Sequence, residues 1–271
     1  MAMWVTPKQA SALEEDVCGK LDWTFLGSAS SHSQFAGLLA GFVLAIMGIL
    51  LAQRGNDGKR ILALTLFSAA FFVLAVDSVL FGIIAGERTC IRAHTEGLIA
   101  SGLLAMGGAL ALAGLAWLFD ISIDGEGRKE LVRIAVVTAY GTQLVGILLV
   151  TQTVYGFQHD LSTAKYWKYT SLPEWTVWVW TATVLILLLI RIARRPRILG
   201  PQARALRLAS YYAVGCTMAS VILFGMVVGM DRTIWEPQIT TNLTWVTAIL
   251  TLVLPTVGLL ILGRAIPRSS D

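Results

Sequence analysis

Charged side chains are scarce in this sequence. Asp, Glu, Lys and Arg make up 14% of its 271 residues, whereas about 25% is usual in a soluble domain. Hydrophobic residues make up 56%, and they form uncharged runs of about twenty residues, the length that crosses a bilayer. The scarcity of charge excludes an ordinary soluble domain. Nucleic-acid binding is excluded too, because no soluble element carries a basic face interleaved with aromatic residues.

The apolar runs also lack the residues that membrane-embedded cofactors need. None of the three histidines lies in the middle of a run, which excludes a haem held by two histidines inside the membrane. No lysine follows Lys168, which excludes a retinal Schiff base on the last helix. P-loop, HExxH, GxSxG and CxxC motifs are absent. We therefore predict no cofactor, and we find no set of acid, base and nucleophile that favours an enzyme.

Seven apolar runs bounded by charged residues or histidine predict seven transmembrane helices. The predicted spans are 33–53, 61–86, 97–119, 134–158, 175–190, 208–230 and 237–263. Each except 175–190 is long enough to cross about 30 Å of hydrocarbon at about 1.5 Å per residue. The predicted fold class is an all-α integral membrane protein. It has an N-terminal tail (1–32), a seven-helix transmembrane domain (33–263) and a C-terminal tail (264–271).

The distribution of Lys and Arg predicts the orientation. The side that receives the 191–207 loop and the C-terminal tail carries roughly twice as many of these residues as the other side. This places the N-terminus outside and the C-terminus in the cytoplasm of a plasma membrane, and the Arg-, Ala- and Gly-rich composition favours a bacterial one. Six arginines without an acid predict contact with anionic lipid headgroups, or alternatively a regulatory docking site. They are Arg191, Arg194, Arg195, Arg197, Arg204 and Arg207.

Three cysteines are present. Cys18 and Cys90 both fall on the predicted outer side, where oxidising conditions allow disulfides. A bond between them would tie the N-terminal tail over the ends of the second and third spans, and two free thiols are the alternative. Cys216 lies inside the sixth span, where we expect a small core residue.

Asp77 is the one carboxylate well inside an apolar run, about 15 Å of helix below the predicted outer end at Glu87. A charge at that depth is costly unless it is paired, hydrated or protonated. No Lys or Arg lies at the same level in another span. Two interpretations remain open. Asp77 is either a hydrogen-bonded residue that holds helices together or an ion or proton site reached from outside.

Polar residues at helical spacing mark a candidate path to Asp77. Thr244, Thr247 and Thr251 are separated by three and four residues and therefore share one face of the seventh span. We place Thr247 at about the same depth as Asp77. With Gln143 of the fourth span, these threonines are candidates to line a water-filled path. The alternative is that their hydroxyls hold packed helices together.

Two further features belong to the second outer loop and the third span. His94 and Glu96 form a candidate outer-face cluster above Asp77. We predict no metal site there, because residues two apart on a helix point away from each other. The third span is rich in glycine, which favours a central, closely surrounded helix.

These features predict a multi-pass membrane protein. We interpret it as a channel or transporter for an ion, a proton or a small solute, with Asp77 in an outward-facing polar path. The alternative is a non-transporting assembly factor, sensor or accessory subunit.

Overall fold

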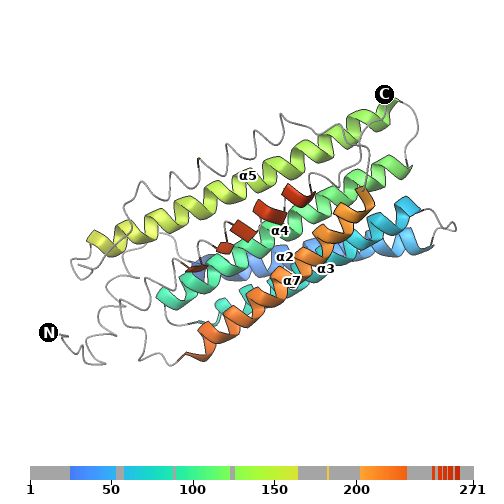
Figure 1. The fold of residues 1–271 in the computed structure, drawn as a ribbon. Helices are drawn as coiled ribbons and strands as arrows, with labels where there is room; N and C mark the ends of the chain where they lie inside the picture. Colours follow the sequence, from blue (N-terminus) through green and yellow to red (C-terminus); the bar gives the residue numbers. More distant parts are fainter. Residues whose placement is uncertain are drawn as a thin grey trace.

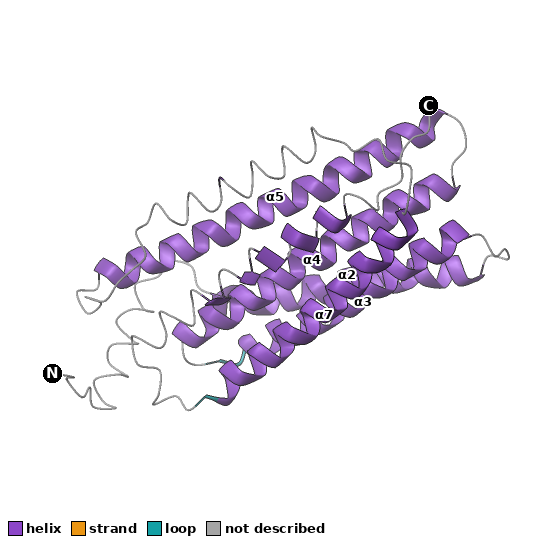
Figure 2. Cartoon of the chain, viewed as in Figure 1, coloured by secondary structure: helices purple, strands orange, loops and turns teal. Residues whose placement is uncertain are grey.

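The structure is a computed structural model that describes residues 25–52, 58–87, 90–122, 126–163 and 202–230, with Ala182 and parts of 246–262. Nearly all of these residues are helical, and none of them is in a strand (Figure 2). The helices described along their whole length are α2 (Phe25–Ala52), α3 (Gly58–Ile84), α4 (Cys90–Ser122), α5 (Glu126–Thr163) and α7 (Gln202–Gly229).

Four of the described helices are long and apolar enough to cross a membrane: Leu26–Ala52, Gly58–Ile84, Arg92–Ser122 and Ala203–Gly229. The chain is therefore a helical, multi-pass membrane protein. α5 covers the predicted span 134–158. The predicted span 175–190 lies outside the described residues apart from Ala182, and 237–263 is described only in part. Seven spans and the outward N-terminus stay predictions.

Two helices begin earlier than the sequence indicates. α2 begins at Phe25, about two turns before the predicted boundary at residue 33. α4 begins at Cys90, so that most of the predicted 87–96 loop forms its first two turns. The charged residues of that segment led to its prediction as a loop. The helix continues through them because they pair with one another inside the protein, as described below.

The described helices form a bundle around α3 and α4 (Figure 1). α3 packs against α2, α4 and α7, and α4 packs against α2, α3, α5 and α7. The helical segments within 246–262, red in Figure 1, also lie along α4. The expectation that the glycine-rich third span is central agrees with this arrangement.

Glycines let α3 approach α4 closely. A Cβ atom added to Gly107 would lie 2.8 Å from the side chain of Leu74, and one added to Gly114 would lie 2.8 Å from Phe67. These distances are too short for ordinary van der Waals contact, so both positions require glycine while their neighbours stay in place. The pairs Leu74–Gly107 and Phe67–Gly114 also define the register of the two helices. From the first pair to the second, the residue number falls by seven on α3 and rises by seven on α4. The helices are antiparallel.

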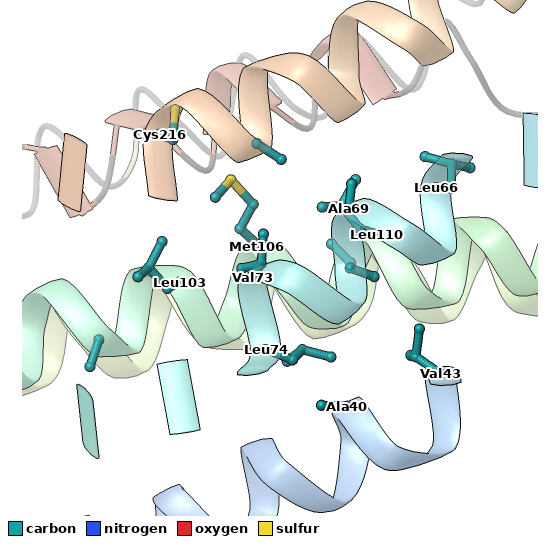
Figure 3. Close-up of a cluster of buried hydrophobic side chains, with 14 of the residues drawn as sticks. Ala40, Val43, Leu66, Ala69, Val73, Leu74, Leu103, Met106, Leu110 and Cys216 are labelled. Carbon is teal, nitrogen blue, oxygen red and sulfur yellow. The ribbon is translucent and has the colours of Figure 1, made fainter. Parts of the chain in front are cut away.

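The core contains buried side chains from α2, α3, α4 and α7 (Figure 3). On α3, Leu74 points toward Ala40 and Val43 of α2, whereas Val73 lies on the side of α7, where Cys216 is buried. Cys216 is thus a core residue, as expected. Adjacent residues of α3 therefore face different neighbours, and the face that carries Val73 continues one turn later at Asp77.

Candidate functional site

Asp77 is completely enclosed by protein, with an exposed fraction of 0%. It lies one helical turn after Val73 and so faces α4 and α7. The register of α3 and α4 places it near the level of Leu104. Neither of its carboxylate oxygens has a hydrogen-bond partner among the residues that the structure describes. An ionised carboxylate in this position would be left without compensation.

One interpretation of the sequence was that Asp77 holds helices together through hydrogen bonds. In the structure, the adjacent residue Ser78 makes interhelical hydrogen bonds instead. The Ser78 hydroxyl donates to the Ser33 carbonyl at 2.8 Å, and the Ser33 hydroxyl donates to the Ser78 carbonyl at 2.8 Å. Thr217, which is buried in α7, donates instead to the Ala213 carbonyl of its own helix. Within the described part of the chain, Asp77 therefore does not hold helices together through a hydrogen bond.

Thr244, Thr247 and Thr251, which we call the threonine stripe, are described in part. Thr247 and Thr251 are both buried, and Thr244 lies outside the described residues. The Thr251 hydroxyl donates to the Leu98 carbonyl of α4 at 3.0 Å, and a Cβ atom on Gly102 would lie 2.8 Å from the Thr251 methyl group. Thr251 therefore packs against α4, which is the alternative that the sequence left open.

The depth of the stripe differs from the sequence-based expectation. Thr251 lies beside Leu98, and a Cβ atom on Gly258 would lie 3.9 Å from the sulfur of Met106, so the C-terminal helical segments run parallel to α4. Thr247 precedes Thr251 by one turn and is therefore nearer than Thr251 to the N-terminal end of α4. Asp77 lies deeper, so the two residues are not at the same depth.

A buried charged cluster lies at the N-terminal end of α4. Its members are Glu87, Arg92 and Glu96, which we call the Arg92 cluster. Arg92 forms an ion pair with Glu87, and its Nε lies 3.2 Å from Oε1 of Glu96. The second contact is close enough for an ion pair, but it lacks the geometry of a hydrogen bond. Two carboxylates thus share one guanidinium, with side-chain exposed fractions of 8% for Arg92 and 4% and 0% for the two acids.

The Arg92 cluster also joins two helices that are distant in the sequence. Nη1 of Arg92 donates to the Val228 carbonyl near the C-terminal end of α7 at 3.3 Å. The carbonyls at a helix C-terminus carry partial negative charge, and a guanidinium there is favourable. Arg92 therefore binds the end of α7 to the beginning of α4.

His94 and Glu96 do not lie on an exposed loop. Both are buried in the second turn of α4, and Thr95 between them is buried as well. Arg92, the centre of the cluster, was not predicted from the sequence. The available signal was the spacing of four residues between Arg92 and Glu96, which places opposite charges on one helical face.

The other predicted residues lie on α4, α5 and α7 or outside the described residues. Gln143 is on α5, but its side chain lies outside the described part of the chain. Cys90 is the first residue of α4, and Cys18 lies outside the described residues, so their disulfide stays a prediction. Arg204 and Arg207 are exposed in the first turns of α7. The remaining arginines of the 191–207 loop lie outside the described residues.

Comparisons of the chain with protein-family models, with curated proteins and with solved structures find no match. Asp77 and the Arg92 cluster are therefore the two features of the structure that indicate a function. Along α4, about ten residues separate the level of the cluster from the level of Leu104, which corresponds to roughly 15 Å. Asp77 is thus well below a charged contact that joins α4 to α7.

Proposed function

We propose that the protein is a carrier for a proton or a small cation, and that Asp77 is the residue that binds it. The observation that supports this proposal most strongly is the buried carboxyl group of Asp77, whose two oxygens have no hydrogen-bond partner among the described residues. An ionised carboxylate without a partner is costly in an apolar environment. A bound proton or cation removes that cost, and its release makes the site ready for another.

A carrier accounts for this geometry better than an open channel does. The cavity described below is lined by α2, α4, α5 and Phe67 of α3, and Asp77 is not among its lining residues. Asp77 is thus enclosed in the conformation described. Access from the N-terminal end of α4 would require α4 and α7 to separate, and the bond from Arg92 to the Val228 carbonyl holds them together there. We assign the Arg92 cluster the role of a gate between Asp77 and that surface.

The finer topology belongs to this proposal. We propose seven spans in a bacterial plasma membrane, with the N-terminus outside and the C-terminus in the cytoplasm. The Cys18–Cys90 disulfide would then lie on the outer surface, beside the Arg92 cluster. In a background in which Cys18, Cys90 and Cys216 are replaced by serine, Ser270→Cys should resist a membrane-impermeant thiol reagent on intact cells and react after permeabilisation. Labelling on intact cells would contradict the orientation.

Transport can be measured with the purified full-length protein in liposomes that contain a pH-sensitive dye. A potassium gradient and valinomycin impose a membrane potential, and the dye reports proton entry. We expect vesicles with the wild-type protein to acidify faster than protein-free vesicles. Asp77→Asn should reduce this rate at least about tenfold, because an amide cannot release a proton. Repeating the assay with a sodium-sensitive dye inside the vesicles and sodium outside tests transport of that cation.

Asp120→Asn is the matched control, because Asp120 is a buried carboxylate of α4 whose partner, Lys59, lies 3.0 Å away. Its flux should stay near the wild-type rate. Wild-type flux in Asp77→Asn would remove Asp77 from transport. If the folded wild-type protein transports neither protons nor sodium, the non-transporting subunit becomes the better interpretation.

A further inference from the structure

A large apolar groove lies between α2, α4 and α5. Its volume is about 660 Å³, within the range of about 300–1,000 Å³ that is common for small-molecule sites. Phe67 is the single lining residue from α3, and none of the lining residues that the structure describes is charged. The groove is separate from Asp77, which is not among its lining residues. The inference below therefore does not depend on the proposed transport function.

Small residues on the facing surfaces of α4 and α5 make room for the groove. Ala105, Gly108 and Ala111 line it from α4, and Gly146 lines it from α5. A Cβ atom added to Gly108 would meet nothing within 4 Å, whereas one added to Gly146 would lie 3.3 Å from Ala105. The helices thus touch at Gly146, and the space opens beside Gly108. A larger side chain at Gly108 would enter the groove without displacing a neighbour.

The shape of the groove suits a long, narrow molecule. It extends along α2 from His32 to Ile46 and along α4 from Ser101 to Leu115. Either distance corresponds to roughly 21 Å of helix, which exceeds the depth of about 15 Å of one leaflet's hydrocarbon. Phe42, which lines the groove on α2, has an exposed fraction of 60%. The groove is therefore open at Phe42, where a lipid chain can enter.

His32, the polar residue at one end of the groove, is held in a defined orientation. The His32 ring stacks on Phe81 of α3, with centroids 5.0 Å apart and planes inclined by 22°. Its Nδ1 lies 2.8 Å from the Ser28 carbonyl. A carbonyl only accepts hydrogen bonds, so Nδ1 carries the proton, and Nε2 of the neutral ring is an acceptor. Thr138, at the other end, donates to the Ile134 carbonyl of its own helix.

We propose that this groove binds a lipid with one long apolar chain and a hydroxyl group in its head. The chain lies between α2, α4 and α5, and the hydroxyl donates to Nε2 of His32. Uncharged walls disfavour a charged headgroup inside the groove. The acceptor at one end of the groove is the ring nitrogen Nε2 of His32, and the acceptor at the other end is the hydroxyl oxygen of Thr138. The proposed lipid places its hydroxyl group at the His32 end.

Photolabelling tests the proposal on the full-length protein in phosphatidylcholine nanodiscs. The probe is a sixteen-carbon alcohol with a diazirine in its chain, and the comparison probe is the matching alkane without the hydroxyl. Peptide mass spectrometry locates the adducts. We expect saturable labelling by the alcohol on the groove-lining peptides of α2 and α4. His32→Ala should weaken labelling by the alcohol about fivefold, as expected for a lost hydrogen bond, and should leave labelling by the alkane unchanged.

Gly108→Phe fills the groove and should reduce labelling by both probes at least about tenfold. Gly215→Phe is the matched control, because a Cβ atom on Gly215 of α7 also meets nothing within 4 Å and Gly215 does not line the groove. Its labelling should match the wild type. If Gly108→Phe does not purify as a folded protein, Gly108→Leu replaces it. Unsaturable labelling, or equal labelling in the Gly108 and Gly215 variants, would overturn the proposal.

Discussion

Ser33 of α2 and Ser78 of α3 exchange hydrogen bonds, since each hydroxyl donates to the backbone carbonyl of the other residue at 2.8 Å. Glycines face this pair. A Cβ atom on Gly37 would lie 3.1 Å from the Ser78 hydroxyl, and one on Gly82 would lie 3.6 Å from the Ser33 hydroxyl. The pair therefore sets the register of the two helices beside Asp77, without involving its carboxylate.

We expect the loss of either hydroxyl to destabilise the protein by about 1 kcal/mol, the usual net contribution of one hydrogen bond. The changes are Ser33→Ala and Ser78→Ala. Unfolding of the purified protein in mixed detergent micelles measures the effect. Ser68→Ala, at an exposed position of α3, is the control and should change little. Equal stability of all three variants and the wild type would show that the pair does not contribute.

Asp77→Asn should raise the stability of the folded protein. The amide keeps the shape of the carboxyl group and avoids the cost of burying it without a compensating partner among the described residues, whether that cost is a buried charge or the protonation of a carboxylate that is ionised in the unfolded chain. The expected gain is about 2 kcal/mol, close to the lower estimates for a charge at this depth. The midpoint of thermal unfolding in detergent measures it. A clear loss of stability would indicate a partner for the ionised group and would weaken the proposed proton or cation site.

Arg92→Gln should be strongly destabilising. It leaves Glu87 and Glu96 buried beside each other without a cation, and breaking a buried ion pair in this way costs about 3–5 kcal/mol. Arg133→Gln is the control, because Arg133 and Glu130 form an exposed pair 3.9 Å apart that should contribute less than about 1 kcal/mol. The comparison uses the same unfolding assay. Similar effects of the two changes would contradict the burial of the Arg92 cluster.

Alanine at the close contacts of α4 should also destabilise the protein. At Gly102, Gly107 and Gly114 the added Cβ atom would lie 2.8 Å from its nearest neighbour, and relief of such crowding typically costs about 1–3 kcal/mol. Gly108→Ala is the control. Its Cβ atom meets nothing within 4 Å, and alanine is the better helix former by about 1 kcal/mol. Stabilisation at all four positions would show that α4 is not closely surrounded.

Hydropathy was sufficient to predict the four described helices that are long and apolar enough to cross a membrane, because long apolar runs have few other stable arrangements there. It was misleading at the beginning of α4. A count of charges treats Glu87, Arg92 and Glu96 as solvated, and their mutual pairing depends on how the chain folds. The spacing of Arg92 and Glu96 was visible in the sequence, whereas the contact with the Val228 carbonyl was not.

The sequence was sufficient to select Asp77 as the candidate residue, but it did not show which residues lie around Asp77. Asp77 stood out because a lone acid in an apolar run is rare. Its separation from Thr247 depends on the register of α4 with α3 and with the C-terminal helical segments, which one sequence does not reveal. The groove beside Gly108 was not predictable either, because the same glycine could equally have been a close helix contact.

The bond between Arg92 and the Val228 carbonyl joins residues separated by 136 positions. α3 emerges from the ribosome long before α7, and α7 supplies part of the surface that encloses Asp77. Until α7 arrives, the carboxyl group must be shielded in another way, by protonation, by water or by the insertion machinery. The interval between synthesis of α3 and of α7 is therefore a stage at which the Asp77 carboxyl group lacks part of its final enclosure.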